Sequence, residues 1–506
     1  MFNPFFTLVL LLTTLVSFRV LAYEATWESL DSRPLPSWYD EAKFGIFIHW
    51  GVFSVPAYRG EWMWHMWGKN GDNKPDPAHD KPNNTMLVQE FIKKTELPKF
   101  AYADYAHRFD ATLYDAHHWA KVFAASGAQY VVLTGKHHEG FCNWDSRNLS
   151  LTWNWNSMDV GPRRDLVGEL AKEVKSMTSH HTDQKIHFGL YHSLYEWYNP
   201  LYEADKQSKF ATSNFVKLKT MPELYDIVKQ YEPELIWSDG DWEANSTYWD
   251  SKQFLAWYAT NSSVAETAVW NDRWGTDAMC KHGSYITCHD RYLPDKLLDK
   301  KWENALTITT TSWGYDRSLT LESYYTTEYL IHTLIQTVAF NGNMLLNVGP
   351  RADGTLDPIF EERLMEIGDW LAVNGEAIFK SRPWSVNQQE KASKVFYTTT
   401  ETKQEDKSTS NSTLYAIFTE WPDDFWLHLS TPVPTDKTTV RLLGLPHAKA
   451  KREHFLKWEA GGKGIDFRLP VLPPGKAPCQ HAWTLAITNI ANFETNADRE
   501  STASTL

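Results

Sequence analysis

Carboxylate, imidazole and indole side chains recur at the ends of short apolar runs along this chain of 506 residues. The clearest candidate for a catalytic residue is Asp239, which lies just after the apolar run Leu235–Trp237 and precedes Gly240. A carboxylate at the carboxyl end of a buried strand is placed to act as a nucleophile or as a general acid or base. An aspartate in a Ser-Asp-Gly sequence also suits a turn, where its oxygens accept backbone hydrogen bonds.

Other segments of this kind carry histidine, glutamate, tryptophan or arginine. They read Phe47-Ile48-His49-Trp50-Gly51, Gly135-Lys136-His137-His138-Glu139-Gly140, Gly189-Leu190-Tyr191-His192-Ser193 and Asn271-Asp272-Arg273-Trp274-Gly275. One such sequence is weak evidence. Several in register with an α/β pattern are hard to explain by packing alone, because the active-site groups of α/β barrels come from the ends of several strands.

The adjacent histidines His137 and His138 raise the alternative of a metal site. Neighbouring residues of a strand point to opposite faces, so both bind one ion only where the strand has already ended. A zinc set of His49, His137 and Asp239 stays open. Hydrogen bonding to substrate hydroxyl groups is the favoured role, and burial of one histidine against backbone is the structural alternative.

Between about residues 43 and 350, apolar runs alternate with amphipathic segments. The expected strands are Phe44–Trp50, Tyr130–Thr134, His187–His192, Leu235–Asp239, Ala268–Asn271, Ala305–Thr309 and Met344–Val348. Helices are expected over Asp115–Ser126, over Arg163–Lys175, and from the Asp357-Pro358 cap to Gly375. This alternation predicts an α/β barrel or a doubly wound sheet.

After about residue 384, the helical pattern gives way to short alternating runs separated by Pro, Gly and Thr. This pattern predicts a small β-sandwich over residues 384–490. Its tryptophans Trp421, Trp426, Trp458 and Trp483 are scattered in the sequence, so we expect the sandwich to support the barrel rather than to bind sugar. Residues 491–506 form a polar tail and are expected to be disordered.

Composition limits the classes of function. The formal net charge of −13 excludes a dominant basic footprint for nucleic acid. Aromatic residues are abundant, with 25 Trp, 23 Tyr and 25 Phe, which fits a large core with Trp-rich packing. The same abundance suits carbohydrate binding, because indole faces pack against the C–H faces of sugar rings.

The N-terminus indicates the compartment. The apolar run Phe5–Phe18 and the following Val20-Leu21-Ala22 predict a cleaved signal peptide over residues 1–22, with a membrane anchor as the alternative. No later segment is long and apolar enough to span a membrane. The mature chain is therefore expected in the secretory pathway, as a lysosomal or secreted protein.

Sequons and cysteines agree with that compartment. N-x-S/T sequons occur at Asn83, Asn148, Asn245, Asn261 and Asn411, which fits a glycoprotein. Four cysteines are too few for a disulfide scaffold at this length. Cys280 and Cys288 are close enough in sequence to close one loop, but the sequence leaves the connectivity open.

An ordered set of strand-end sequences carries a resemblance to a known family. The set is Phe47-Ile48-His49-Trp50-Gly51, His137-His138-Glu139-Gly140-Phe141, Trp237-Ser238-Asp239-Gly240, Asn271-Asp272-Arg273-Trp274-Gly275 and Ser312-Trp313-Gly314-Tyr315. It resembles glycoside hydrolase family 29, the retaining α-L-fucosidases, and especially the animal lysosomal, tissue-type enzymes. The similarity runs from about Trp27 to Ile487. The resemblance implies an irregular (β/α)8-like TIM barrel over residues 23–383, followed by a C-terminal β-sandwich.

The resemblance also implies site residues. Asp239 matches the nucleophile. The substrate-binding positions that it implies are His49, Glu61, Trp62, His137, His138, Tyr191, Trp237, Arg273 and Trp313. Many relatives carry two adjacent acids where this chain has His289 and Asp290. Asp290 is the favoured acid/base, and Glu303 is the second candidate, with a structural ion pair as the alternative role of Glu303.

The expected reaction follows from the family's chemistry. A retaining glycosidase uses two carboxyl groups about 5–5.5 Å apart and needs neither a metal nor an organic cofactor. We expect an exo-α-L-fucosidase acting on fucosylated glycoproteins, glycolipids or oligosaccharides, with a homo-oligomer as a further expectation. The alternatives are an inactive fucose-binding lectin, which the His289 departure suggests, and a metal-dependent barrel hydrolase. Linkage preference and the choice between lysosome and secretion stay open.

Overall fold

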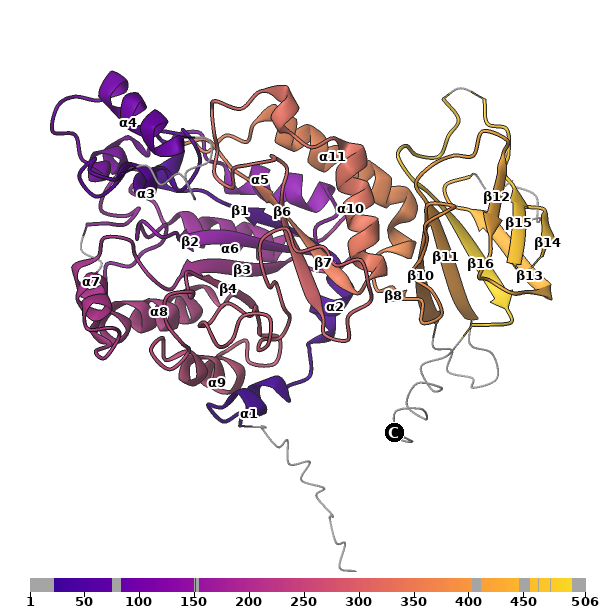
Figure 1. Cartoon of the computed structure of the whole chain (residues 1–506), viewed down its shortest axis with the longest axis horizontal. Helices are drawn as coiled ribbons and strands as arrows, with labels where there is room; N and C mark the ends of the chain where they lie inside the picture. The colour runs from indigo at the N-terminus through magenta and orange to yellow at the C-terminus, as the bar shows by residue number, and fades with distance from the viewer. Residues whose placement is uncertain are drawn as a thin grey trace, which may run out of the picture.

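The computed structural model describes residues 22–74, 83–149, 151, 154–402, 411–445, 456–462, 464–473 and 475–493. The expected signal peptide therefore lies outside the described residues except for Ala22, and the expected tail does so beyond Phe493. An α/β part holds the N-terminal and central segments, and a smaller β part holds the C-terminal segments beside it (Figure 1). Among the described residues, no helix is both long and apolar enough to cross a bilayer.

A parallel sheet forms the centre of the α/β part. Within the described residues its strands are β1 (Phe44–Ile48), β2 (Tyr130–Lys136), β3 (His187–Ser193), β4 (Leu235–Asp239), β5 (Val269–Trp270), β6 (Trp302–Thr307) and β7 (Gly342–Val348). Their order is β5-β4-β3-β2-β1-β7-β6, and every pairing is parallel. The expected TIM-like barrel is thereby confirmed, although several strand ends differ by one to three residues; β6, for example, begins at Trp302 rather than at Ala305.

A short segment bridges the two edge strands, β5 and β6. Ser284 donates its backbone N–H to Trp270 of β5, and Ile286 donates to Lys301 and accepts from Glu303 of β6. Ile286 forms only a single parallel bridge with Trp302, which is too little for a strand of its own. The place of an eighth strand is thus filled by irregular chain, which makes the barrel irregular.

Side chains of the sheet alternate between two cores, as the period of a strand requires. The outward-facing residues of β1, β3 and β4 pack under the helices in one large cluster. The inward-facing residues form a separate, strongly aromatic cluster that includes Phe47, Tyr130, Tyr191 and Trp237. Asp239 lies two residues after Trp237 and so shares its inward face at the carboxyl end of β4.

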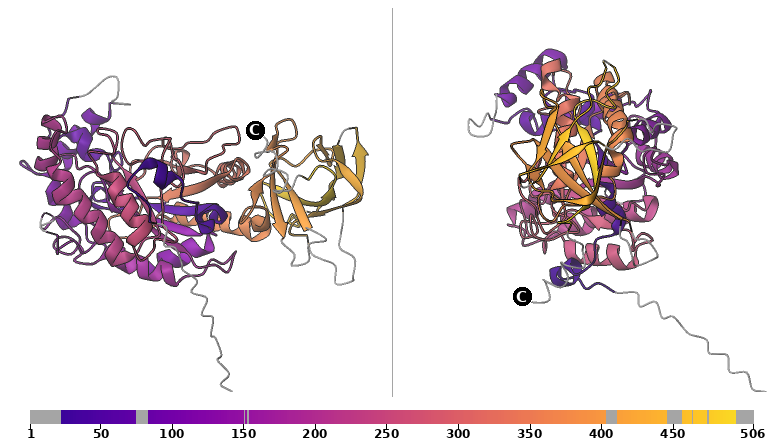
Figure 2. Two further views of the ribbon diagram at one scale, coloured as in Figure 1. Left: turned by 90° about the horizontal axis from the view of Figure 1, so that it is seen from below. Right: turned by 90° about the vertical axis from the view of Figure 1, so that its right-hand side faces the viewer.

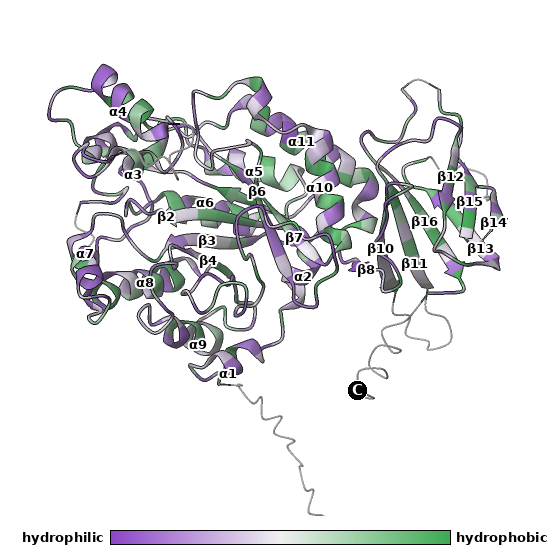
Figure 3. Ribbon diagram, viewed as in Figure 1, coloured by the Kyte–Doolittle hydropathy of each residue, from purple (hydrophilic) through white to green (hydrophobic). Residues whose placement is uncertain are grey.

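The α/β part also contains helices, which Figure 1 shows around the sheet and beyond its ends. They are α1 (Trp27–Asp31), α2 (Ser37–Ala42), α3 (Met63–Trp67), α4 (Asn84–Thr95), α5 (Ala116–Ala125), α6 (Leu166–Ser176), α7 (Pro200–Gln207), α8 (Met221–Tyr231), α9 (Ser251–Asn261), α10 (Thr327–Ala339) and α11 (Pro358–Asn374). Asp115 and Asp357 cap α5 and α11 as expected, while Asp165 caps α6, which therefore begins later than Arg163. Helices α10 and α11 alternate apolar and polar stretches (Figure 3).

The C-terminal part is built from antiparallel strands. These are β8 (Arg382–Pro383), β9 (Gln389–Glu390), β10 (Val395–Thr402), β11 (Asn411–Phe418), β12 (Trp426–Leu429), β13 (Pro434–Leu442), β14 (Trp458–Gly461), β15 (Gly464–Arg468) and β16 (Trp483–Ile490). In the described part, one sheet runs β13-β16-β11-β10-β8 with β9 beside β10, and the other runs β12-β15-β14. Their inner faces share one apolar core, so the expected β-sandwich is confirmed.

The sandwich lies against the side of the barrel that carries α10. Helix α10 contacts both β8 and β10. Viewed from below, the two parts lie next to each other along the long axis of the molecule, and from the end the sandwich lies in front of the barrel (Figure 2). The mouth of the barrel, where the strands end, is formed by loops of the α/β part.

Candidate active site

Asp239 lies at the mouth of the barrel with 12% of its side chain exposed. Its Oδ2 accepts a hydrogen bond from Tyr191 Oη at 2.9 Å, and its Oδ1 accepts from Arg273 Nη1 at 3.0 Å. His138 Nε2 lies 3.6 Å from Oδ2. A nearly buried carboxylate held by a phenol and a guanidinium is fixed in direction and suits attack on a carbon atom.

Arg273 joins Asp239 to a second carboxylate. Its Nη2 donates to Asp290 Oδ1 at 2.7 Å, while its Nε donates to Thr287 Oγ1 at 3.1 Å. Burial alone would lower the pKa of Arg273, but the adjacent Asp290 and Asp239 raise it well above its ordinary value. This guanidinium is therefore a fixed positive charge between two carboxylates.

Asp290 lies on the segment between β5 and β6, and 43% of its side chain is exposed. Burial acts to raise its pKa, but Arg273, with smaller contributions from Arg291 and His49, lowers the pKa below the ordinary value. Arg273 thus links Asp290 to Asp239 and keeps the Asp290 carboxyl ionised when no ligand covers it.

The Asp290 segment is anchored twice. Cys280 and Cys288 form a disulfide, which settles the pairing that the sequence left open. Asp272 accepts hydrogen bonds from the backbone N–H groups of Cys280, Thr287 and Cys288 and from the Thr287 hydroxyl. A covalent bridge and a buried carboxylate together fix the chain that presents Asp290.

Glu303 lies elsewhere in the barrel. It is the second residue of β6, fully buried, and its carboxylate accepts from Tyr39 Oη and Tyr130 Oη at 2.8 Å and from Trp237 Nε1 at 2.9 Å. Burial raises the pKa of Glu303 to about 7. No lysine or arginine pairs with it among the described residues, so phenol and indole donors take the place of the ion pair considered as its alternative role.

The three predicted histidines gather beside Asp239. The ring centres of His137 and His49 are 5.9 Å apart, and those of His137 and His138 are 4.1 Å apart. His49 Nδ1 is hydrogen-bonded to Asn347 at 2.7 Å, and His138 Nδ1 to Ser193 at 2.7 Å. Burial, helped by His137, lowers the pKa of His49 to about 3 and that of His138 well below its ordinary value. Both are neutral rings able to bind hydroxyl groups.

These histidines do not assemble a metal site. Among the residues that the structure describes, no group of three or more His, Cys, Asp or Glu side chains is placed to hold a metal ion. His192, part of the same strand-end pattern, faces away from the site, because its Nε2 contacts the buried Glu223 at 3.1 Å. Lys136 lies in that same buried cluster, 2.6 Å from Glu223.

Glu61 and the tryptophans line the rest of the site. Glu61 Oε2 accepts from the backbone N–H groups of Trp313 at 3.1 Å and Gly314 at 2.8 Å, and burial raises its pKa. Trp313 lies with its ring centre 5.1 Å from that of His49. Trp62 packs against His138 at 5.4 Å. Glu61 thus holds the Trp313 loop in place, while Trp313 and Trp62 present aromatic surface.

Asp241 and Trp242 also lie at the site, although the sequence pattern predicted no role for either. Asp241 accepts from Gly275 N–H at 2.9 Å, and burial raises its pKa to about 6. Trp242 is 39% exposed, lies 5.5 Å from His138 and stacks with Trp62 at 6.4 Å between ring centres. The available signal was position, because both residues directly follow Asp239-Gly240 on the chain.

A parallel barrel with two carboxylates on one arginine, beside neutral histidines and tryptophans, defines a carbohydrate hydrolase. Residues 11–376 match the α-L-fucosidase family, and residues 388–488 match the α-L-fucosidase C-terminal domain. The chain belongs to the α-L-fucosidase family, glycoside hydrolase family 29. The family and the enzyme class expected from the sequence are thereby confirmed.

Known relatives agree over nearly the whole chain. Tissue α-L-fucosidase of Mus musculus is 46% identical over 92% of this chain and 94% of its own length. Plasma α-L-fucosidase of Homo sapiens is 44% identical over 92% and 93%. The solved structure of Thermotoga maritima α-fucosidase with fucose covers 92% of this chain and all of its own, with a TM-score of 0.67 and 28% identity.

Proposed function

We propose that this chain removes terminal α-L-fucose from glycans as a retaining exo-glycosidase, with Asp239 as the nucleophile and Asp290 as the acid/base. The observation that carries these assignments is the single guanidinium of Arg273, which binds one carboxylate on each terminal nitrogen. Carboxylates on neighbouring nitrogens lie close together, as the separation of about 5–5.5 Å in retaining enzymes requires. The hydrogen bonds of Glu303 go instead to Tyr39, Tyr130 and Trp237.

The reaction is a double displacement. Asp239 attacks the anomeric carbon of fucose while Asp290 gives its proton to the departing glycosidic oxygen, which leaves as an alcohol. In the second step Asp290 takes a proton from water, and the water oxygen displaces Asp239 from the same carbon. Two inversions return fucose with its original anomeric configuration.

Asp290 must gain a proton before the first step, although Arg273 lowers its pKa in the free protein. A bound glycan covers the exposed part of this side chain, and desolvation of a carboxylate raises its pKa. A lower pH further increases the fraction of molecules in which Asp290 is protonated. We therefore expect faster turnover at acidic than at neutral pH.

Neutral histidines give the fucose hydroxyl groups their partners. His49 and His138 are held by Asn347 and Ser193, so each presents its other ring nitrogen to the site. Trp313, fixed through Glu61, offers an apolar wall for the C–H groups and methyl of the sugar. Each of these contacts suits a small, neutral, hydroxylated ring.

The part of the bound glycan beyond fucose extends out of the site next to Trp242. This indole is exposed at the rim, beside both His138 and Trp62. A sugar joined to fucose has a C–H face that packs on such a ring. Trp242 therefore recognises the group next to fucose rather than fucose itself.

Hydrolysis of an aryl α-L-fucoside tests the proposal, with wild type, Asp239→Ala and the surface control Asp436→Ala at acidic and neutral pH. Wild type and control should turn over, while Asp239→Ala should lose at least about 10³-fold in kcat. Azide, which fits the space of the missing carboxylate, should restore part of the rate. Fucose binding without turnover by folded wild type would instead indicate the lectin alternative.

We propose further that the mature chain begins near Tyr23, enters the secretory pathway and carries N-glycans. The sequon asparagines whose side chains the structure describes are all exposed: Asn83, Asn148, Asn245 and Asn261. The proposed catalytic domain spans residues 23–383 and the proposed sandwich residues 384–490, although β8 at Arg382–Pro383 already pairs with β10. A mobility shift on enzymatic deglycosylation tests the N-glycans, and N-terminal sequencing tests where the mature chain begins. Light scattering tests whether the protein is a homo-oligomer.

A further inference from the structure

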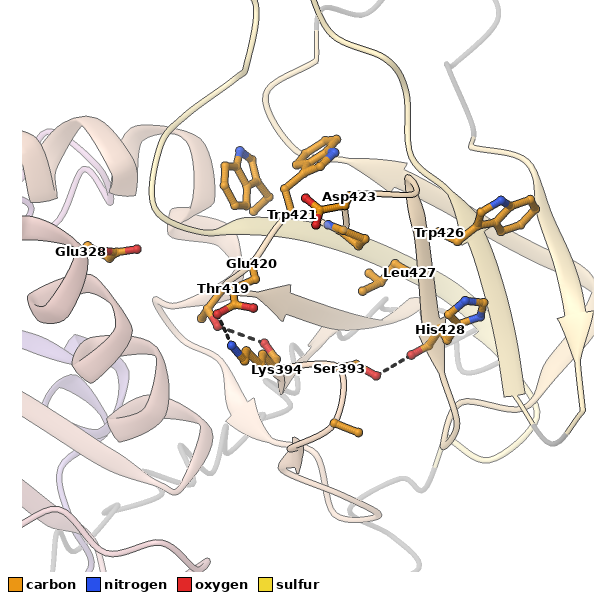
Figure 4. A pocket seen from close by; sticks show the side chains of 13 residues that line it. Glu328, Ser393, Lys394, Thr419, Glu420, Trp421, Asp423, Trp426, Leu427 and His428 are labelled. Atoms are coloured by element: carbon orange, nitrogen blue, oxygen red, sulfur yellow. Dashed lines mark hydrogen bonds and ion pairs between the residues drawn. The ribbon is translucent and has the colours of Figure 1, made fainter.

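A pocket of about 590 Å³ lies on the β-sandwich, in a different domain from Asp239 (Figure 4). Its walls come from the segment before β10, the segment after β11, strand β12 and the start of β16, and Glu328 of α10 closes one side. The volume falls within the roughly 300–1,000 Å³ of small-ligand sites. The α-L-fucosidase reaction proposed above makes no use of it.

Two tryptophans that are far apart in the sequence pack on each other in this pocket. Trp421 and Trp483 lie with ring centres 5.2 Å apart and planes at 83°, and Trp426 contributes a third indole. The expectation that these residues do not cluster is therefore wrong for Trp421 and Trp483, which the segment after β11 and the start of β16 bring together. Trp458 alone lies outside the lining.

The outward direction of Trp426 is set by the pleat of β12. Leu427 and Leu429 are buried in the core of the sandwich, whereas Trp426 is half-buried and His428 is exposed. Alternate residues of a strand face opposite sides, so Trp426 and His428 share the outer face. The core does not account for the placement of this indole.

Hydrogen bonds hold the pocket in shape. Ser393 Oγ donates to the backbone oxygen of His428 at 2.7 Å, and Thr419 Oγ1 donates to that of Lys394 at 3.2 Å. Lys394 also forms an ion pair with Glu420. A site whose walls are tied together before a ligand arrives loses little conformational entropy on binding.

We propose that this pocket binds a neutral, fucose-free oligosaccharide segment. Indoles offer faces for the C–H surfaces of sugar rings, and the carboxylates of Glu420 and Asp423 accept hydrogen bonds from hydroxyl groups. Among the lining residues, the carboxylates of Glu328, Glu420 and Asp423 outnumber the single ammonium of Lys394, so anionic sugars are repelled.

The pocket on the β-sandwich would bind part of a glycan without contacting its fucose. Nothing in it depends on Asp239, so loss of turnover and loss of oligosaccharide binding are separate outcomes. The sandwich would then retain the enzyme on branched glycans and glycoproteins, while the barrel removes the terminal sugar.

The test measures binding of a tetrasaccharide of two N-acetyllactosamine units to the full chain by titration calorimetry. Trp426→Ala and Trp421→Ala should each raise the dissociation constant about tenfold, since a lost aromatic contact is worth up to about one factor of ten. The matched control Trp458→Ala should leave it unchanged. All three variants should keep wild-type kcat/KM on an aryl α-L-fucoside.

Several results would overturn the site. These are no binding by wild type, equal binding by wild type and Trp426→Ala, tighter binding of the disialylated tetrasaccharide, and preferential binding of choline, which the indoles and carboxylates would also attract. If Trp421→Ala fails to fold in a thermal melt, because Trp421 packs on Trp483, then Trp426→Ala decides alone.

Discussion

The guanidinium carbon of Arg273 lies 4.5 Å from the centre of the Trp237 indole, so the residue that binds both site carboxylates is supported by an aromatic ring. Nε1 of the same indole donates to Glu303. Glu303 thus fixes Trp237, Trp237 supports Arg273, and Arg273 holds Asp239 and Asp290. In this arrangement Glu303 orients Trp237 and, through it, Arg273, whereas Asp239 and Asp290 are the carboxylates that we propose take part in the reaction.

Replacement of Asp290 by asparagine should slow substrates according to their leaving group. A fucosyl disaccharide needs a proton on its departing oxygen, so its kcat/KM should fall about 10²–10⁴-fold. A nitrophenyl fucoside, whose leaving group needs little help, should lose far less in kcat/KM. Steady-state kinetics on both substrates check this, with the exposed Asp295→Asn as control. Equal losses on the two substrates would rule Asp290 out as the acid.

Replacement of Glu303 by glutamine should lower kcat/KM about tenfold for both substrates alike. The amide keeps one acceptor oxygen but replaces the other with an NH2 group, which cannot accept from the phenols of Tyr39 and Tyr130 or from the indole of Trp237. A loss that does not depend on the leaving group marks a positioning role. A loss confined to the disaccharide would instead make Glu303 the acid.

Glu303 should also make the stability of the protein depend on pH. Burial raises its pKa from 4.5 to about 7, so the folded state binds a proton that the unfolded state has released between these values. The free energy of unfolding should therefore fall as pH rises through this window, by about 3 kcal/mol for this group. Denaturant melts from pH 4.5 to 8 should show a smaller fall in Glu303→Gln than in wild type. If the free energy of unfolding changed with pH equally in both proteins, the raised pKa of Glu303 would be contradicted.

The sequence was sufficient for much of this arrangement. All seven expected strands of the barrel occur among the described residues, because apolar runs followed by glycine or polar residues are unambiguous. The sequence did not predict that Glu303 lies on a strand. The polar Trp302-Glu303-Asn304 is not typical of the start of a strand, so β6 was expected to begin at Ala305. The bridge through Arg273 and the tryptophan pocket depend on tertiary packing, which no local pattern encodes.

Opening the Cys280–Cys288 bridge should affect Asp290 more than the fold. The double variant Cys280→Ser with Cys288→Ser should lose about 2 kcal/mol of stability, as expected for a short loop. Asp272 still holds the backbone of this segment, so activity should fall severalfold without being abolished. Thermal melts and disaccharide hydrolysis check both effects, with Cys479→Ser, a free cysteine, as the control. Complete loss of activity in a folded double variant would show that Asp272 does not hold the segment.

Trp242 should distinguish natural glycans from artificial substrates. Its exposed indole lies beside Trp62 and His138 at the rim of the site, where we propose that it binds the sugar that carries fucose. Trp242→Ala should therefore lower kcat/KM for a fucosyl trisaccharide about tenfold, the value of one aromatic contact. Hydrolysis of methyl α-L-fucoside, whose leaving group is too small to reach the ring, should stay within about twofold of wild type. Trp242→Phe, which keeps an aromatic face, should recover most of the trisaccharide activity. An equal loss on both substrates would mean that Trp242 acts by holding His138 in place and not by binding the leaving sugar.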